Sequence, residues 1–451
     1  MPAPAASLAE VVQEVAAVAA GDQSVAAFER ALDGLVRHAH RDRAGLAEAL
    51  RPIMRSRSRG WSDCRPADVY DVAAALRGDP PREFAFHVYQ RHRPEEFSLA
   101  GTLLAARLTE AMELVETGAQ PFLLAVPTDS TGALDAAVLV ERTAELERLG
   151  VEAAPVDLAQ ALLRLTPPED PEVAAAAEAL SSEAGRRLAR WLREGGLPHQ
   201  DSEPADWYRP ESPDAPPAPA RPGVDLDPWF PPAAAALVGP TRASRSLSEL
   251  PMTFWWAQLP HHHDEVTARD YTRSVYAGGR RRTRVLPFVA ESGGPAGYAV
   301  HRALAEGTAM NPHGDEPTVD ALLVLAARGR LDAGMLGRQL DMLLRSGRAE
   351  PNRVADSLRA AAGTGAYGTV WAVLAAALPG LLRGTPARGV AGLLALAAEC
   401  VSRCGTAAQG GPGGPGGPAG PGGFPELDAV AGRKGSSLTI RNARLLRDAL
   451  G

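Results

Sequence analysis

Aromatic side chains and lysine are scarce in this chain of 451 residues. Aromatic residues make up 5% of it, so a core must come mainly from leucine, valine and alanine, and leucine and alanine favour helix. Lys434 is the only lysine. The phosphate-loop pattern G-x-x-x-x-G-K-[ST] is broken around it by Arg433 and Gly435. The sequence therefore disfavours P-loop or kinase-type phosphoryl transfer and Schiff-base chemistry.

Cysteines and long apolar runs are also few. The three cysteines, Cys64, Cys400 and Cys404, do not make a disulfide framework, which favours a reducing compartment. We interpret Cys400 and Cys404, four residues apart on a predicted helix, as small packed side chains rather than as half of a zinc site. The N-terminus lacks the basic region of a signal peptide, and the longest apolar stretch, Val370–Leu382, is too short to span a bilayer. We expect a cytoplasmic protein without a membrane segment.

The charge balance is acidic. The formal net charge is −7 and the isoelectric point is about 5.9, which argues against a dedicated nucleic-acid or membrane-surface binder. Residues 363–368 match G-x-G-x-x-G, but a helix rather than a strand is predicted before them. We therefore interpret these glycines as an interhelical turn and expect no cofactor.

What the chain has in quantity is helical periodicity. Helices of 10 to 17 residues separated by glycine turns recur without strands, and one helix pair takes about 35–40 residues, as in HEAT-type repeats. The helix over 367–382 is apolar nearly all round and needs neighbours on several faces. This pattern predicts an all-α fold, an α-solenoid of stacked HEAT-like helix pairs. The clearest predicted helices cover residues 316–327, 335–344, 354–362, 367–382, 390–404 and 438–450.

Two stretches of unusual composition divide the chain. Residues 198–232 are rich in proline and predict an irregular linker. Residues 410–423 repeat glycine and proline and predict a flexible insertion. We therefore expect an N-terminal helical domain over 1–197 and a C-terminal helical-repeat domain over 233–451.

Residues 121–150 have the most definite local pattern. A short extended apolar run ends at Pro127, and Asp135 then stands where a helix N-cap is expected. The helix that follows should carry Leu139, Leu146 and Leu149 on one apolar stripe and end at Gly150.

Several of these stretches resemble a family of actinobacterial HEAT-like helical-repeat proteins of unknown function, often encoded near SWIM-type zinc-finger proteins. The match resembles the C-terminal half of those longer proteins, and residues 123–146 are its most specific part. The resemblance implies an accessory or scaffolding role and gives no functional residue. The chain departs from it in the two low-complexity segments. The matching stretches are residues 35–54, 123–146, 156–167, 185–200, 319–340 and 369–382.

The densest group of metal-capable side chains is the run from His261 to Glu265. In a helix that starts here, His261 and Glu265 share a face, with His262 nearby, so these three are the weak candidates for metal ligands. The alternative, which we favour, is a polar turn that opens a helix after Pro260. We therefore expect no metal.

Two arginine clusters are candidates for contacts with a partner or with phosphates. Arginine beside aromatic residues can hold phosphates and stack bases, although solvated faces or ion pairs with neighbouring helices are the commoner role. We expect nucleic-acid binding to be weak. The residues concerned are Arg51, Arg55, Arg57 and Arg59, and Arg280, Arg281, Arg282 and Arg284.

The sequence contains no recognisable catalytic motif. We therefore expect a non-enzymatic helical-repeat scaffold that binds a protein partner. Two alternatives stay open: a nucleic-acid-associated factor that uses the arginine clusters, and a metal-dependent hydrolase centred on residues 261–265.

Overall fold

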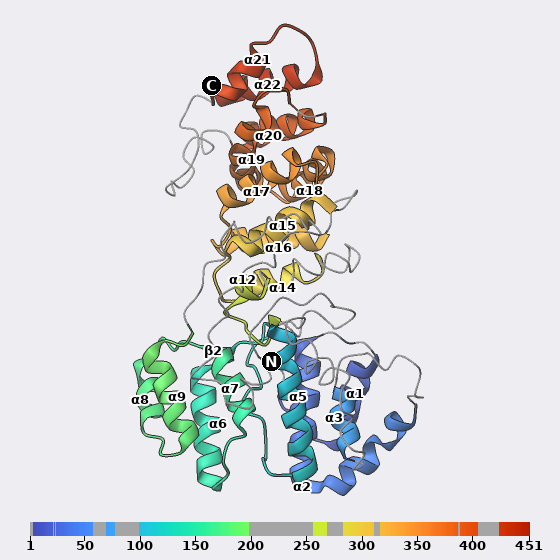
Figure 1. The fold of residues 1–451 in the computed structure, drawn as a ribbon, viewed down its shortest axis with the longest axis vertical. Helices are drawn as coiled ribbons and strands as arrows, with labels where there is room; N and C mark the ends of the chain where they lie inside the picture. The colour runs from blue at the N-terminus through green and yellow to red at the C-terminus, as the bar shows by residue number, and fades with distance from the viewer. Residues whose placement is uncertain are drawn as a thin grey trace, which may run out of the picture. The chain divides into compact units, whose positions relative to one another are not determined.

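The protein is described by a computed structural model whose described residues are mostly helical (Figure 1). They divide into two compact units, the first comprising residues up to 197 together with 256–267 and 292–294, and the second most of the chain from 283 onward. The predicted linker, residues 198–232, and the predicted glycine-rich insertion, residues 410–423, lie wholly outside the described residues. The structure describes residues 3–20, 22, 24–56, 69–76, 99–197, 256–267, 283–310, 316–386, 388–404 and 424–451.

Unit one is a set of helices packed in contact pairs. Helix α2 contacts α1, α3 and α5, while α5 contacts α7, and α6 contacts α8 and α9. Phe28, Leu32, Leu35 and Val36 form the buried stripe of α2 at helical spacing. The helices are α1 (Leu8–Ala20), α2 (Val25–Ser56), α3 (Val69–Ala75), α5 (Leu99–Thr117), α6 (Ala136–Leu149), α7 (Pro155–Arg164), α8 (Pro171–Glu178), α9 (Glu183–Glu194) and α12 (His263–Val266).

Helix α6 begins and ends where the sequence predicts. The Asp135 carboxylate accepts the N–H groups of Ala137 and Val138 at 2.8 and 3.2 Å, and Gly150 ends the helix with φ of 67°. Left-handed backbone of this kind favours glycine because it has no Cβ. The predicted apolar stripe is only partly right, since Leu139 and Leu146 are buried but Leu149 is 44% exposed. Leu149 is the last residue of the helix, next to its C-cap Gly150.

One pair of very short strands joins the two halves of this unit. Strand β1 (Leu134–Asp135) pairs in parallel with β2 (Leu165–Thr166), with Leu134 opposite Leu165 and Asp135 opposite Thr166. The leucines are buried and their neighbours are exposed, which is the alternation expected of a strand with one covered face. The ladder fixes the start of α6 beside the end of α7.

Unit two is a succession of helices that contact one another in pairs. The predicted helices over 316–327, 367–382, 390–404 and 438–450 are confirmed. From α15 onward, most helices contact the next helix, the next but one, or both (Figure 1). The helices are α14 (Leu286–Glu291), α15 (Tyr298–Met310), α16 (Glu316–Ala327), α17 (Ala333–Arg345), α18 (Pro351–Gly363), α19 (Tyr367–Leu382), α20 (Val390–Cys404), α21 (Pro425–Ala431) and α22 (Leu438–Leu450).

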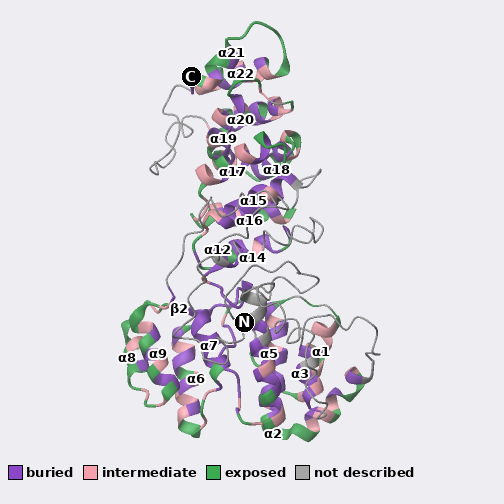
Figure 2. Ribbon diagram, in the orientation of Figure 1, coloured by how far each residue is buried: buried purple, intermediate pink, exposed green. Residues whose placement is uncertain are grey.

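Helix α19 is covered by neighbours on several sides. It contacts α17, α18, α20 and α21, as the apolar residues on all its sides predict. Its approach to α17 is close, because a Cβ on Gly337 would lie 2.4 Å from the carbonyl oxygen of Val373. Figure 2 shows buried residues along these helices. Among the described residues, no helix is long and apolar enough to cross a membrane.

A buried histidine links two turns of unit two. His301 Nε2 lies 2.9 Å from the backbone nitrogen of Asp332 and accepts its proton, so Nδ1 carries the ring proton and donates to the Gly297 carbonyl at 2.7 Å. Burial lowers the pKa of His301, although the Gly297 carbonyl and Asp332 oppose the shift. The neutral imidazole is therefore the form that makes both hydrogen bonds, and it holds the backbone of Asp332, the N-cap of α17.

Candidate functional site

The two predicted arginine clusters are only partly described. Arg51 is exposed and pairs with Glu48 one turn earlier in α2. Arg284, just before α14, is also exposed and belongs to the other unit. The side chain of Arg55 and the residues Arg57, Arg59, Arg280, Arg281 and Arg282 lie outside the described part of the structure.

Three of the basic residues upstream of the first cluster, Arg37, His38 and His40, contact other parts of unit one. Arg37 pairs with Asp33 one turn away, and its guanidinium lies 5.0 Å from the centroid of the Phe122 ring. His38 Nε2 lies 3.3 Å from the Ala5 carbonyl, and His40 Nδ1 lies 2.7 Å from the Gly118 carbonyl. These three side chains therefore join segments of unit one and do not form a phosphate-binding surface.

The three consecutive histidines face different partners. His261 Nε2 lies 3.2 Å from the Arg164 carbonyl and 3.4 Å from Thr166 Oγ1, beside strand β2. His263 Nε2 lies 3.1 Å from the carbonyl of Trp256, and His262 is buried. Within the described residues, no three His, Cys, Asp or Glu side chains are placed to share an ion. The side chain of Glu265 lies outside them.

The remaining motifs lie in turns or in packed positions. Gly363, Gly365 and Gly368 join α18 to α19, so a helix and not a strand precedes them, as predicted. Burial, with smaller contributions from Cys404 and Glu399, raises the pKa of the Cys400 thiol to about 12, and burial raises that of Cys404. Protonated thiols are poor nucleophiles and poor metal ligands. The free cysteines are therefore packing residues.

The most organised polar group in unit one was not predicted. Glu29 of α2 binds Arg107 of α5 through both oxygens at 2.5 Å each, and its Oε1 also lies 2.8 Å from Arg164 Nη2 of α7. All three side chains are at most 1% exposed. Burial alone would raise the pKa of Glu29, but Arg107 and Arg164 outweigh it and lower that pKa to about 2. The carboxylate is thus charged at neutral pH and ties three helices together.

The same group of side chains holds residues 122–126 inside the unit, and this segment contains a bend and a turn rather than the extended run that the sequence predicts. Asp157 accepts the N–H groups of Leu124 and Ala125 at 2.6 and 3.1 Å, and Asp33 accepts that of Leu123 at 2.9 Å. Buried backbone outside a helix or sheet needs such partners, because an unpaired N–H or C=O is costly. The charged side chains therefore replace the hydrogen bonds that secondary structure would supply.

Arginines satisfy the carbonyl side of this segment. Arg142 Nη1 donates to the carbonyls of Leu124 and Val126 at 2.9 and 2.5 Å. Arg164 Nη1 donates to the Ala125 carbonyl at 2.6 Å, while its Nε donates to the carbonyl of Ala257 at 3.0 Å. One guanidinium thus connects residues 122–126, the segment before α12 and the Glu29 carboxylate.

A carboxylate and an amide cap the first turn of α7. Glu110 of α5 accepts the N–H groups of Val156 and Asp157 at 2.8 and 2.6 Å, and Gln120 Oε1 accepts that of Ala154 at 2.8 Å. Burial raises the pKa of Glu110 to about 7, although these N–H donors favour its charged form. Because Ala154 is the N-cap and offers no side-chain acceptor, distant residues do the capping.

The turn after residues 122–126 is closed by Asp129 and Gly132. Asp129 Oδ1 accepts from the backbone of Thr131 and Ala133 at 2.8 and 3.1 Å. Gly132 has φ of 94°, and a Cβ there would lie 2.5 Å from the carbonyl oxygen of Ala257. Only glycine suits this position. Residues 123–133 thus belong both to the stretch that carries the most specific part of the predicted resemblance, 123–146, and to the segment whose backbone the buried side chains bond.

No known protein family, curated protein or solved structure matches the chain. The resemblance to actinobacterial HEAT-like proteins thus stays a prediction. A sequence signal for the buried charges does exist, since Arg107 and Arg164 each follow apolar residues inside apolar helical runs. The described charges of this network are buried and bonded to the protein itself, so they have the chemistry of a structural centre rather than of a catalytic one.

Proposed function

We propose that the chain is a non-enzymatic scaffold whose second unit is an α-solenoid of HEAT-like helix pairs that binds a protein partner. One observation carries the proposal: helices two places apart pack directly on one another, as in the contacts α15–α17, α17–α19, α16–α18 and α18–α20. Such contacts arise when helix pairs stack in layers. Stacked pairs present long continuous surfaces, which suit protein partners.

The position of the charged residues agrees with this role. The best-organised polar group is buried and holds the backbone of unit one, so it offers no group to a substrate. The few cysteines are consistent with a cytoplasmic location. A nucleic-acid-associated factor and a metal-dependent hydrolase are the alternatives, and no described contact favours either.

Capture of the partner with matched glycine variants tests the proposal. The tagged full chain is used as bait in lysate of its source, and any protein recovered in stoichiometric amount is purified and titrated against the chain. We expect saturable binding. Gly337→Leu should weaken it, because the side chain meets the backbone of α19, whereas Gly363→Leu should not, because nothing lies within 4 Å of that position.

Two results would contradict the proposal. One is that no protein is recovered in stoichiometric amount by the wild-type chain. The other is a partner bound equally by Gly337→Leu, Gly363→Leu and wild type, because that partner would not depend on the stacked helices. Circular dichroism of both variants checks that the change at Gly337 is local, with helix content close to wild type.

A further inference from the structure

Three successive turns of unit two lie side by side at one end of its helices. They join α17 to α18 (346–350), α19 to α20 (383–389) and α21 to α22 (432–437). A Cβ on Gly389 would lie 3.2 Å from Pro351 Cβ, which places the second turn beside the first. Arg433 Nη2 donates to the Gly384 carbonyl at 2.7 Å, which places the third turn beside the second. The three turns therefore form one continuous edge.

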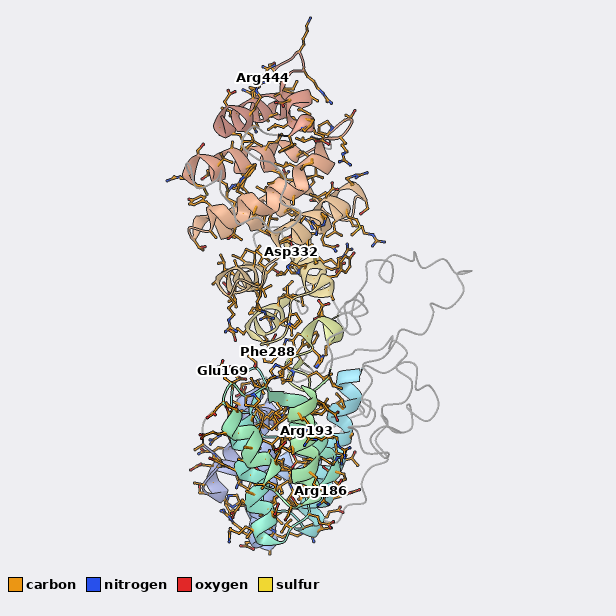
Figure 3. The ribbon with its side chains drawn as sticks, turned by 90° about the vertical axis from the view of Figure 1, so that its left-hand side faces the viewer. Glu169, Arg186, Arg193, Phe288, Asp332 and Arg444 are labelled. Atoms are coloured by element: carbon orange, nitrogen blue, oxygen red, sulfur yellow. The ribbon has the colours of Figure 1, made fainter. Side chains whose placement is uncertain are left out.

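This edge is strongly basic in a chain that is acidic as a whole. Its basic residues are all exposed, and we call them the basic edge: Arg345, Arg348, Arg383, Arg388, Arg433 and Lys434. Lys434 is the only lysine of the protein. Arg444, labelled in Figure 3, holds the third turn by donating to the carbonyls of Ala431 and Arg433 at 2.9 and 2.8 Å. The last members of the edge thus stand on an ordered backbone.

The fold neutralises part of this positive charge, and Arg348 has a partner within the chain. Arg383 and Arg345 pair with Glu426 and Asp341 at 3.1 and 3.6 Å, but both arginines are more than half exposed, and such pairs are weak. Arg388 and Lys434 have no hydrogen-bond or ion-pair partner among the described residues.

Arginines at the opposite ends of the helices are used differently. In the turn from α16 to α17, Arg328 and Arg330 donate to the backbone carbonyls of Glu291 and Ala290. Arg359, near the end of α18, pairs with Asp356 at 2.7 Å. Arg284 and Arg338 are also exposed in unit two, so what distinguishes the edge is that its six exposed basic side chains lie on neighbouring turns.

The dimensions and residue types of the edge favour a peptide. Helices in contact lie about 8–10 Å apart, so three turns span about 16–20 Å, the length of about six residues of extended chain. None of the residues in these turns is aromatic, so the edge offers no ring on which a base could stack. Exposed carboxylates at alternate positions of an extended strand would reach successive turns.

We propose that the basic edge binds a short acidic, extended segment of the partner protein. This inference rests on the proposed scaffold function and names the chemistry of the partner. Because the charges on both sides are exposed, binding weakens as salt rises.

A charge-reversal pair with a matched control tests the inference. The probe is a fluorescein-labelled peptide in which Glu and Asp alternate with Ser and Gly, titrated with the full chain by fluorescence anisotropy at low and physiological salt. Arg388→Glu with Lys434→Glu should raise the Kd about tenfold. Arg359→Glu with Arg447→Glu reverses two exposed arginines away from the edge and should leave the Kd unchanged.

Four outcomes would overturn the inference. The first is that the peptide shows no saturable binding, and the second is that the control pair raises the Kd as much as the edge pair does. The third is that a single-stranded oligonucleotide or phosphatidylserine vesicles bind more tightly than the peptide and that the edge variant abolishes this binding. The fourth is a captured native partner that binds the edge variant as tightly as wild type. This last result contradicts the edge and leaves the scaffold proposal standing, whereas failure of the wild-type chain to capture any partner contradicts the scaffold itself.

Discussion

The ion pair between Glu29 and its two arginines should be the most sensitive point of unit one. Glu29→Gln keeps the shape of the side chain and removes its charge. Arg107 loses a bidentate carboxylate at 2.5 Å, and Arg164 loses an acceptor at 2.8 Å, while both stay buried. Removing one partner of a buried pair costs about 3–5 kcal/mol, because the remaining charge is left without compensation. We expect the free energy of unfolding to fall by about 4 kcal/mol.

The chain supplies a control with the same geometry and different burial. Glu145 also binds an arginine through both oxygens, with Arg148 Nη2 and Nε at 2.6 and 2.8 Å, but both side chains are well exposed. Glu145→Gln should therefore change stability by only a small fraction of the effect at Glu29. Urea unfolding followed by circular dichroism compares the two variants with wild type. Equal losses for the two variants would refute the reasoning, because burial would then not set the cost.

The same residue predicts a response to acid. Its pKa is lowered from 4.5 to about 2 in the folded chain, so its contribution to stability is present above pH 4.5 and is lost as the pH falls towards 2. Wild type should lose stability relative to Glu29→Gln over this interval. A constant difference between the two from pH 5 to pH 2 would show that Glu29 is not the group responsible.

Three further predictions concern other parts of the structure. Gly132→Ala should lower the free energy of unfolding, measured by thermal unfolding, by about 2 kcal/mol or more, because the new Cβ meets the Ala257 backbone. Gly150→Ala has open space around it and should lower that free energy by about 1 kcal/mol. Equal losses in the two variants would contradict the close approach at Gly132. The pKa of His301 is lowered from 6.5 in the folded chain, so unit two should be most stable above pH 6.5 and should lose stability as the pH falls. His301→Leu should remove this dependence of stability on pH. An unchanged pH dependence in the variant would show that His301 is not the group responsible. Deletion of 405–451 should leave helices α14 to α20 helical by circular dichroism, because most contacts reach no further than two helices along, and general loss of helix would contradict a layered stack.

Local features of the fold were open to prediction because their causes are local. The N-cap at Asp135 and the stop at Gly150 act within one turn of α6, and both were predicted. The apolar face of the helix over 367–382 likewise predicted its enclosure. Leu149 was wrongly placed on the buried stripe, because periodicity says which face a residue occupies and not where the covering helices end.

The partners of the buried charges could not be predicted because they lie far apart in the chain. Arg107 and Arg164 lie 78 and 135 residues from Glu29. Nothing in the sequence near Asp157 indicates that it accepts the N–H groups of residues 124 and 125, more than 30 positions earlier. The apolar run at 122–126 was predicted to be extended, but it contains a bend and a turn, and its burial depends on side chains from three helices.

Arginine illustrates why composition alone did not indicate a site. The sequence contains many arginines and gives no sign of which ones are bonded inside the fold. The structure shows that some donate to buried carboxylates or backbone carbonyls, whereas others are exposed. Arg164 uses three donor groups for one carboxylate and two carbonyls, a task that needs a planar guanidinium and that a lysine ammonium would not perform in the same geometry. Arg328 and Arg330 bind backbone carbonyls at the ends of unit two, while Arg388 is left exposed. Exposed arginines are the ones available to a partner, and five of them lie on three neighbouring turns that the sequence separates by more than 30 residues each.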